Sequence, residues 1–107
     1  MRLYLKRPRS NVNSVAEYNL STRSVTVLKG SQVSEHIAYS EKFRGAKSIE
    51  KSRASVVNKC IVTRDITFKS ASTAANFVAG ASMNGLVAWK NVEGKTLKSI
   101  IAEMESK

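Results

Sequence analysis

The chain of 107 residues contains little of the residue types on which most catalytic and metal sites are built. Cysteine, histidine and aspartate each occur once, as Cys60, His36 and Asp65, and the seven glutamates are scattered. A thiol nucleophile needs a base within hydrogen-bond reach, and a bound transition metal needs several clustered ligands. A two-metal nuclease needs converging carboxylates. We therefore expect no catalytic residues, no metal site and no cofactor, so the chain is not expected to be an enzyme.

The sequence also lacks the features of secreted and membrane proteins. One cysteine cannot form an intramolecular disulfide, which small secreted domains usually need. No segment approaches the roughly 20 apolar residues of a membrane span, and the N-terminal residues have no apolar signal core. Hydrophobic residues make up 42% of the chain, enough for one packed core. We expect a cytoplasmic protein from a bacterium or phage.

Acidic residues are scarce relative to basic ones. The chain has 18 Lys and Arg and eight Asp and Glu, which gives a formal net charge of +10. Residues 1–70 hold 14 basic and 5 acidic side chains, whereas residues 71–107 hold four and three. This asymmetry favours an anionic partner on one side of the molecule, and the alternative is a solvated lysine-rich surface. We expect nucleic acid as the partner and no membrane, and the oligomeric state stays open.

Hydrophobic periodicity predicts an α+β fold, with a small, mostly antiparallel sheet of three to five strands and about three helices packed on it. Alternation predicts a hairpin of strands at residues 15–20 and 24–29. A loop is expected at 31–47, a helix capped by Ser48 at 48–59, and short strands at 60–62 and 65–68. Thr96 is expected to cap a last helix, whose inner face would carry the apolar residues Leu97, Ile100, Ile101 and Met104.

Residues 1–14 stand apart from the single domain expected at 15–107. They carry four basic side chains, no acid and the only proline, Pro8. Alternating leucines allow a short edge strand, and the charge allows a basic arm, so both alternatives stay open. After Pro8, the polar stretch 10–14 predicts a flexible connection.

The segment from Phe68 to Lys90 is the most informative part of the sequence. Ser70 or Ser72 can cap a helix that ends at Gly80 in the left-handed conformation. This helix would bury a narrow face made of Ala71, Ala74, Ala75 and Val78. Asn84 and Gly85 predict a tight turn into a strand at 86–90. On that strand Trp89 would share the core face with Val87, and the alternative makes Trp89 a platform for a base.

This segment also carries a resemblance to a known family, domain of unknown function 4357. The resemblance rests on Phe68, Ser70, Ser72, Ala74, Ala75, Val78, Gly80, Asn84, Gly85, Trp89, Lys90, Gly94 and Leu97, and upstream on Val25–Ser31. It covers roughly residues 15 to 100. Ala71, Thr73 and Leu86 depart from the family's usual proline, alanine and tryptophan. Such domains are often found at the C-terminus of GIY-YIG nuclease-like and restriction-modification-associated proteins. They are similar to the restriction-enzyme-and-adenine-methylase-associated domain, which is proposed to bind DNA.

The expected function is a non-catalytic accessory module that binds nucleic acid, DNA rather than RNA, with a nuclease or methylase subunit as a further partner. The alternative is a protein-interaction module that docks an acidic protein. Phosphates would meet a diffuse basic surface made of Lys6, Arg7, Arg9, Lys29, Lys42, Arg44, Lys47, Lys51, Arg53, Lys59, Arg64, Lys69 and Lys90. Ser70 and Ser72 at a helix N-terminus can seat a phosphate, and Asn84 can hydrogen-bond an adenine edge.

Overall fold

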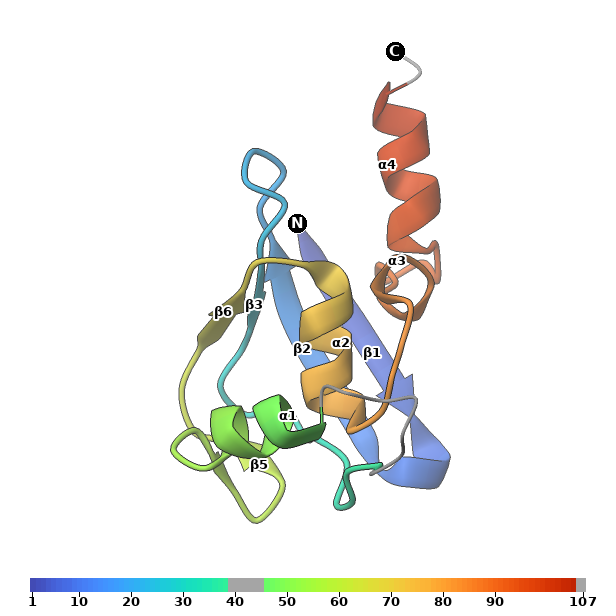
Figure 1. Ribbon diagram of the computed structural model, residues 1–107. Coiled ribbons are helices and arrows are strands. Elements are labelled where there is room, and N and C mark those ends of the chain that lie inside the picture. Colours follow the sequence, from blue (N-terminus) through green and yellow to red (C-terminus); the bar gives the residue numbers. More distant parts are fainter. Residues whose placement is uncertain (39–45, 106–107) are drawn as a thin grey trace.

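The computed structural model describes residues 1–38 and 46–105, which form an antiparallel sheet with helices packed against it (Figure 1). In the order β1-β2-β3-β6, the sheet strands are β1 (Arg2–Arg7), β2 (Val12–Tyr18), β3 (Val25–Val27) and β6 (Ile66–Phe68). A separate two-stranded hairpin contains β4 (Val57–Asn58) and β5 (Ile61–Val62). The helices are α1 (Ala46–Arg53), α2 (Ala71–Ala79), the single turn α3 (Gly85–Ala88) and α4 (Leu97–Glu105). The α+β class predicted from the sequence is confirmed.

Alternation along the strands gives the sheet one buried face and one open face. The buried side chains are Leu3, Leu5, Val12, Ser14, Ala16, Tyr18, Val25 and Val27. Helix α2 lies over the sheet in Figure 1 and packs on β2, β3 and β6. The other face, called the open face below, presents the alternate side chains Arg2, Tyr4, Lys6, Asn13, Val15, Glu17, Thr26 and Thr67. Within the described residues, no helix is long and apolar enough to span a bilayer.

Helix α2 has the start, end and apolar face that the sequence predicts. The Ser70 hydroxyl accepts a hydrogen bond from the Thr73 N–H at 3.1 Å, which caps the first turn. At the other end Gly80 has φ +69, and its N–H donates to the Asn76 carbonyl. Six of the nine residues of α2 are buried, four of them alanines whose small side chains let the helix approach the sheet closely.

The N-terminal residues form a strand, not an arm. Strand β1 pairs with β2 over its full length, from Arg2 opposite Glu17 to Arg7 opposite Val12. The flexible connection predicted after Pro8 is wrong, because Pro8–Ser10 form a 3-10 turn (η1) and β2 already begins at Val12. Asn11 supplies the left-handed residue of this turn at φ 57, a conformation that asparagine tolerates well.

The helix predicted at 48–59 is shorter and begins earlier than expected. Helix α1 ends at Arg53, and Ser48 lies inside it rather than at its cap. Lys59 and Cys60 both have positive φ, 51 and 67, so they form the turn of the β4–β5 hairpin. Two successive left-handed residues cannot continue a right-handed helix.

The strand predicted at 86–90 is a helical turn, α3. The Asn84 side chain accepts a hydrogen bond from the Leu86 N–H at 3.1 Å, which caps a helix instead of starting a hairpin. Asn84 has φ −85, which differs from the positive φ of the tight hairpin turn predicted there. Val87 is 48% exposed and does not share a face with Trp89. Only Lys90 pairs with a strand, through two backbone hydrogen bonds to Tyr4 of β1.

Trp89 is buried, as predicted, although the expected strand is absent. Its exposed fraction is 0%, and its indole N–H donates to the Ala71 carbonyl at 3.0 Å. Gly85 lies against the same backbone, because a Cβ at this position would overlap the Ala71 carbonyl group. In α4, Leu97 and Ile100 pack into the core, whereas Met104 is 46% exposed and does not lie on the inner face predicted for it.

We predict that Trp89→Ala lowers the free energy of unfolding by about 3–5 kcal/mol, because it empties a large core volume. Trp89→Phe should cost less, since it keeps most of the ring and loses mainly the hydrogen bond to Ala71. Urea denaturation followed by circular dichroism measures both values. Val92→Ala is the control, because Val92 is 82% exposed and should change stability by no more than about 0.5 kcal/mol. An unchanged denaturation midpoint in Trp89→Ala would contradict this role.

Candidate nucleic-acid interface

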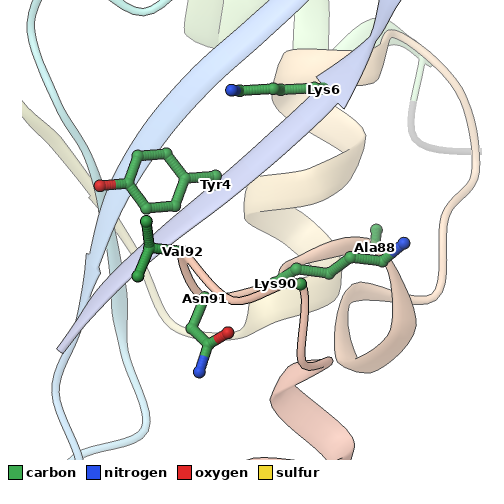
Figure 2. A pocket seen from close by; sticks show the side chains of 7 residues that line it. Tyr4, Lys6, Ala88, Lys90, Asn91 and Val92 are labelled. Atoms are coloured by element: carbon green, nitrogen blue, oxygen red, sulfur yellow. The ribbon is translucent and has the colours of Figure 1, made fainter.

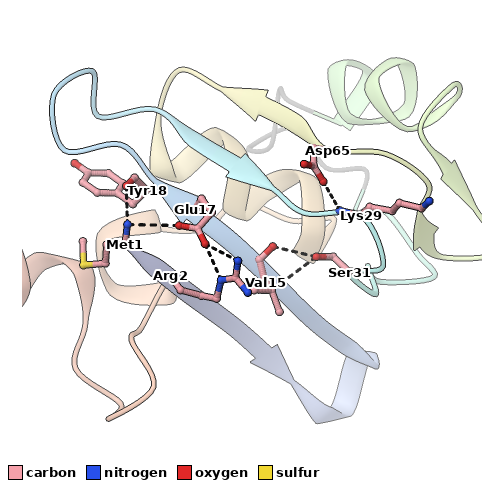
Figure 3. Close-up of polar contacts among 8 residues, drawn as sticks. All are labelled: Met1, Arg2, Val15, Glu17, Tyr18, Lys29, Ser31 and Asp65. Atoms are coloured by element: carbon pink, nitrogen blue, oxygen red, sulfur yellow. Dashed lines mark hydrogen bonds and ion pairs between the residues drawn. The ribbon is translucent and has the colours of Figure 1, made fainter.

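The ion pairs of the described residues lie away from most of the basic side chains predicted to bind. Glu17 pairs with Arg2 at 2.7 Å and with the N-terminal amine at 3.5 Å (Figure 3). Two further pairs use carboxylates of α4: Lys95 pairs with Glu103 at 2.7 Å, and Arg23 pairs with Glu105 at 3.5 Å. These acidic groups therefore neutralise cations that the sequence did not assign to binding.

Hydrogen bonds within these pairs stabilise their charged forms. The bond from the Arg2 guanidinium lowers the pKa of the Glu17 carboxyl below its ordinary value. The bond to Glu103 raises the pKa of the Lys95 ammonium. Both pairs therefore stay ionised at neutral pH.

Nine of the predicted binding cations have no carboxylate partner among the described residues. All nine are exposed: Lys6, Arg7, Arg9, Lys29, Lys51, Lys59, Arg64, Lys69 and Lys90. Lys47 is exposed near the start of α1, and Lys42 and Arg44 lie outside the described residues. Unpaired exposed cations keep their full attraction for an anion, because no neighbouring carboxylate cancels it.

Two lysines far apart in sequence, Lys6 and Lys90, line one hollow with Tyr4. The Tyr4 N–H donates to the Lys90 carbonyl at 2.7 Å, and the Lys90 N–H donates back to Tyr4 at 3.0 Å. Directly paired residues point to the same face of a sheet, so the lysine joins Tyr4 and Lys6 on the open face. A hollow of about 360 Å³ opens there (Figure 2). Its lining residues are Tyr4, Lys6, Ala88, Lys90, Asn91, Val92 and Gly94.

A second hollow, of about 500 Å³, begins at the next residue of β1. Arg7 and Arg9 line it together with His36 from the loop beside Gly80. Glu35 is the one carboxylate that lines either hollow within the described residues. We call Tyr4, Lys6, Arg7, Arg9 and Lys90 the β1 surface, because three of them lie on β1, Arg9 follows it in η1 and Lys90 pairs with Tyr4. Tyr4 and Lys6 lie on the open face, whereas Arg7 pairs with buried Val12 and points to the other side of the strand.

The remaining exposed cations do not converge on the β1 surface. Lys29 and Arg64 occupy neighbouring turns, where the Lys29 N–H donates to the Asp65 carboxylate at 2.8 Å (Figure 3). Lys59 lies in the β4–β5 turn, and Lys51 lies on α1. Lys69 lines a third hollow beside the start of α2. The diffuse surface expected from the sequence is therefore divided into several separate groups.

The polar side chains assigned to phosphate and base contacts make hydrogen bonds within the chain. Ser70 caps α2, and Asn84 caps α3. The Ser72 hydroxyl accepts from the Gly85 N–H at 3.0 Å and so ties α3 to α2. Each of these oxygens therefore serves the close packing around Trp89, a role that the sequence suggested only for the caps.

Arg53 is not an exposed phosphate ligand, because its guanidinium folds inward. It donates to the Phe77 carbonyl at 2.6 and 3.0 Å and to the Ser34 carbonyl at 2.8 Å. A weaker contact reaches the Val78 carbonyl, and the ring of Phe77 lies 5.9 Å away. A cation at the carbonyl end of a helix is favourable, so Arg53 joins α1 to the C-terminus of α2.

Tyr4 is the residue of the β1 surface that sequence analysis missed. Alternation already placed it between Arg2 and Lys6, on the side opposite to Leu3 and Leu5. An aromatic residue flanked by cations at i−2 and i+2 on a strand is the signal that could have found it. Nothing local in the sequence could have brought Lys90 beside it.

A comparison with family models agrees with the family resemblance of the sequence. A family model described as "Domain of unknown function (DUF4357)" matches residues 7–101. No curated protein and no solved structure matches this chain.

We predict that Arg53→Met destabilises the fold by about 2–3 kcal/mol, because it removes charge-assisted hydrogen bonds to the end of α2. Lys51→Met on the same helix removes the same charge from an exposed position and should change stability by no more than about 0.5 kcal/mol. Chemical denaturation of the two variants makes the comparison. Equal losses in both would mean that the inward hydrogen bonds of Arg53 contribute nothing.

Proposed function

The chain belongs to the DUF4357 family, a family of unknown function, and we propose that this member is a nucleic-acid-binding module. Phosphates of the ligand lie along the β1 surface, where Lys6, Arg7, Arg9 and Lys90 neutralise them. The module binds without catalysing a reaction, and it acts as an accessory to another protein. DNA is the proposed ligand in preference to RNA.

The observation that supports this proposal most strongly is the separation of cations from acids. Arg2, Arg23 and Lys95 have carboxylate partners, whereas the four cations of the β1 surface have none among the described residues. Excess charge of one sign costs compactness through self-repulsion, so an uncompensated cluster is typical of a surface that meets an anion. One hollow lies on the open face beside Tyr4, Lys6 and Lys90, and a second lies at the end of β1 beside Arg7 and Arg9, so each pair of cations has a hollow that a phosphate can enter.

Further parts of the proposal rest on the family resemblance and on the ligand itself. The resemblance implies an association with restriction-modification proteins, and on that basis we propose DNA as the ligand and a nuclease or methylase subunit as the partner. Nucleic acid is met in the cytoplasm of a bacterial cell, so we propose that location. Within the described residues no three His, Cys, Asp or Glu gather as a metal site would require, and the proposed role needs none.

We predict salt-dependent binding to a duplex DNA probe of random sequence. If about six phosphates are neutralised, log affinity should fall against log salt concentration with a slope near −5. Reversing Lys6 and Lys90 to glutamate, or Arg7 and Arg9, should flatten the slope by about one unit for each lost contact. Fluorescence anisotropy between about 50 and 200 mM salt measures it.

The matched control reverses two lysines outside the β1 surface. Lys95 and Lys98 belong to the C-terminal third, and their replacement by glutamate changes the net charge by the same amount. This variant should keep the slope of the wild type. Equal losses in all variants would mean that net charge alone attracts DNA, and absence of binding by the wild type at low salt would refute the proposal.

A second candidate function, a protein-docking module, is supported by apolar side chains around α3 and α4. Leu86, Val87 and Met104 are 40%, 48% and 46% exposed. A hollow of about 350 Å³ lies nearby, lined by residues that include Tyr18, Leu86 and Ile101. Apolar contacts strengthen or hold constant as salt rises, so a protein partner held there should stay bound at salt concentrations that release DNA. Co-sedimentation of the module with its nuclease or methylase subunit at two salt concentrations separates the two functions.

A further inference from the structure

The hollow beside Tyr4 has a shape and a composition that the phosphate-binding role does not use. Its volume is about 360 Å³, near the lower end of the range for small-molecule sites. Four of its seven lining residues offer apolar surface or bare backbone: Tyr4, Ala88, Val92 and Gly94. Phosphate needs only cations and N–H donors, so an apolar lining calls for a different part of the ligand.

Tyr4 is held as a rigid platform. Its backbone bonds to Lys90 on one side, and its strand pairs with Val15 of β2 on the other. The ring is half-buried, so one side has support while another stays accessible. No hydrogen bond of its hydroxyl occurs within the described residues, which leaves that group available to a ligand. A fixed aromatic ring loses little conformational entropy when a flat molecule stacks on it.

Cations stand close to the aromatic ring. The Lys6 ammonium lies 5.9 Å from the centre of the Tyr4 ring, and Lys90 enters the same hollow from the neighbouring segment. In Figure 2 the Lys6 and Tyr4 side chains project to one side of β1, whereas the Lys90 side chain extends the other way, past Ala88. The two ammonium groups therefore diverge, and they can meet phosphates on either side of one nucleotide.

Val92 supplies an apolar contact at the mouth of the hollow. It is 82% exposed, the largest exposed fraction among the large hydrophobic residues of the described chain. Figure 2 shows it beside the Tyr4 ring, and both residues line the hollow. Asn91 stabilises the turn that contains Val92, because its side-chain oxygen accepts hydrogen bonds from the N–H groups of Glu93 and Lys95. The valine is thereby presented to a ligand.

We propose that this hollow receives one unpaired nucleotide, its base stacked on Tyr4 and against Val92 and its flanking phosphates held by Lys6 and Lys90. The inference rests on the proposed function and deepens it, because it names the part of the nucleic acid that the site takes. A base inside a duplex is covered on both faces by its neighbours, so a protein ring stacks only on a base that is out of the helix. The π-face is common to all bases, and binding is therefore tolerant of sequence.

The test compares four labelled probes of equal length by fluorescence anisotropy: oligothymidine, oligouridine, an abasic phosphodiester strand and a DNA duplex. The wild type should bind oligothymidine about 5- to 150-fold more tightly than the abasic strand, the range expected for one aromatic–base stack. Tyr4→Ala should remove this preference, whereas Tyr4→Phe should keep it. Oligouridine distinguishes an RNA strand from a DNA strand, and preference for either over the abasic strand supports the site.

Two measurements separate a binding role of Tyr4 from a structural one. Thermal melting of Tyr4→Ala and Tyr4→Phe checks that both variants fold. Photo-crosslinking of the wild type to an oligonucleotide that carries 5-iodouracil should place the adduct on Tyr4, as read by mass spectrometry. Thr26→Ala on the same open face is the matched control and should alter neither affinity nor crosslink.

The outcomes distinguish failure of this site from failure of the proposed function. Equal affinity of the wild type for the oligothymidine and abasic strands would overturn the stacking site while phosphate binding stands. Tyr4→Ala that keeps the wild-type preference, in a folded protein, would overturn it as well. No binding of any probe at low salt would overturn both.

Discussion

The hydrogen bond from the Trp89 indole to the Ala71 carbonyl marks the place on which the rest of the structure depends. The backbone N–H of Trp89 donates to the Gly85 carbonyl and so ends α3. The backbone carbonyl of Trp89 accepts a hydrogen bond from the N–H of Leu97 at the start of α4. The next residue, Lys90, pairs with β1. Trp89 thus links the first turn of α2 through its side chain to α3 and α4 through its backbone, and the hydrogen bond to Ala71 satisfies the buried indole donor.

Close packing at this point requires that the neighbouring positions be small. Gly85 touches the Ala71 backbone so closely that no Cβ fits there, and the Gly85 N–H donates a hydrogen bond to the Ser72 hydroxyl. Residues that resemble a binding motif in the sequence are therefore used to dock α3 on α2. The same constraint orients the following chain, so that Trp89 points inward and Lys90 outward onto the open face.

Charge is distributed in accord with this architecture. Ion pairs tie the N-terminus and Arg2 to Glu17 of β2, and the β2–β3 loop to α4, whereas the cations of the β1 surface have no carboxylate partner among the described residues. Arg53 shows how little a basic residue's charge says about its role. Arg53 lies two residues after Lys51 on α1. Its guanidinium donates to the Phe77 carbonyl near the end of α2 and to the Ser34 carbonyl, whereas Lys51 is exposed to solvent. Helical periodicity separates two such positions by more than half a turn.

The sequence by itself determined the α+β class, the β2–β3 hairpin, α2 with both of its caps, the burial of Trp89 and the excess of positive charge. These features depend on local patterns, because a cap, a turn glycine or an alternating strand is specified within a few residues. Only the tertiary structure decided that residues 86–88 form a helical turn, that Arg53 faces inward and that Lys90 lies beside Tyr4 and Lys6. Asn84 and Gly85 suit a hairpin and a helix start equally well, and contact with Ala71 selects between them. The hollow at Tyr4 joins residues more than 80 positions apart, and such a long-range pairing leaves no trace in local periodicity.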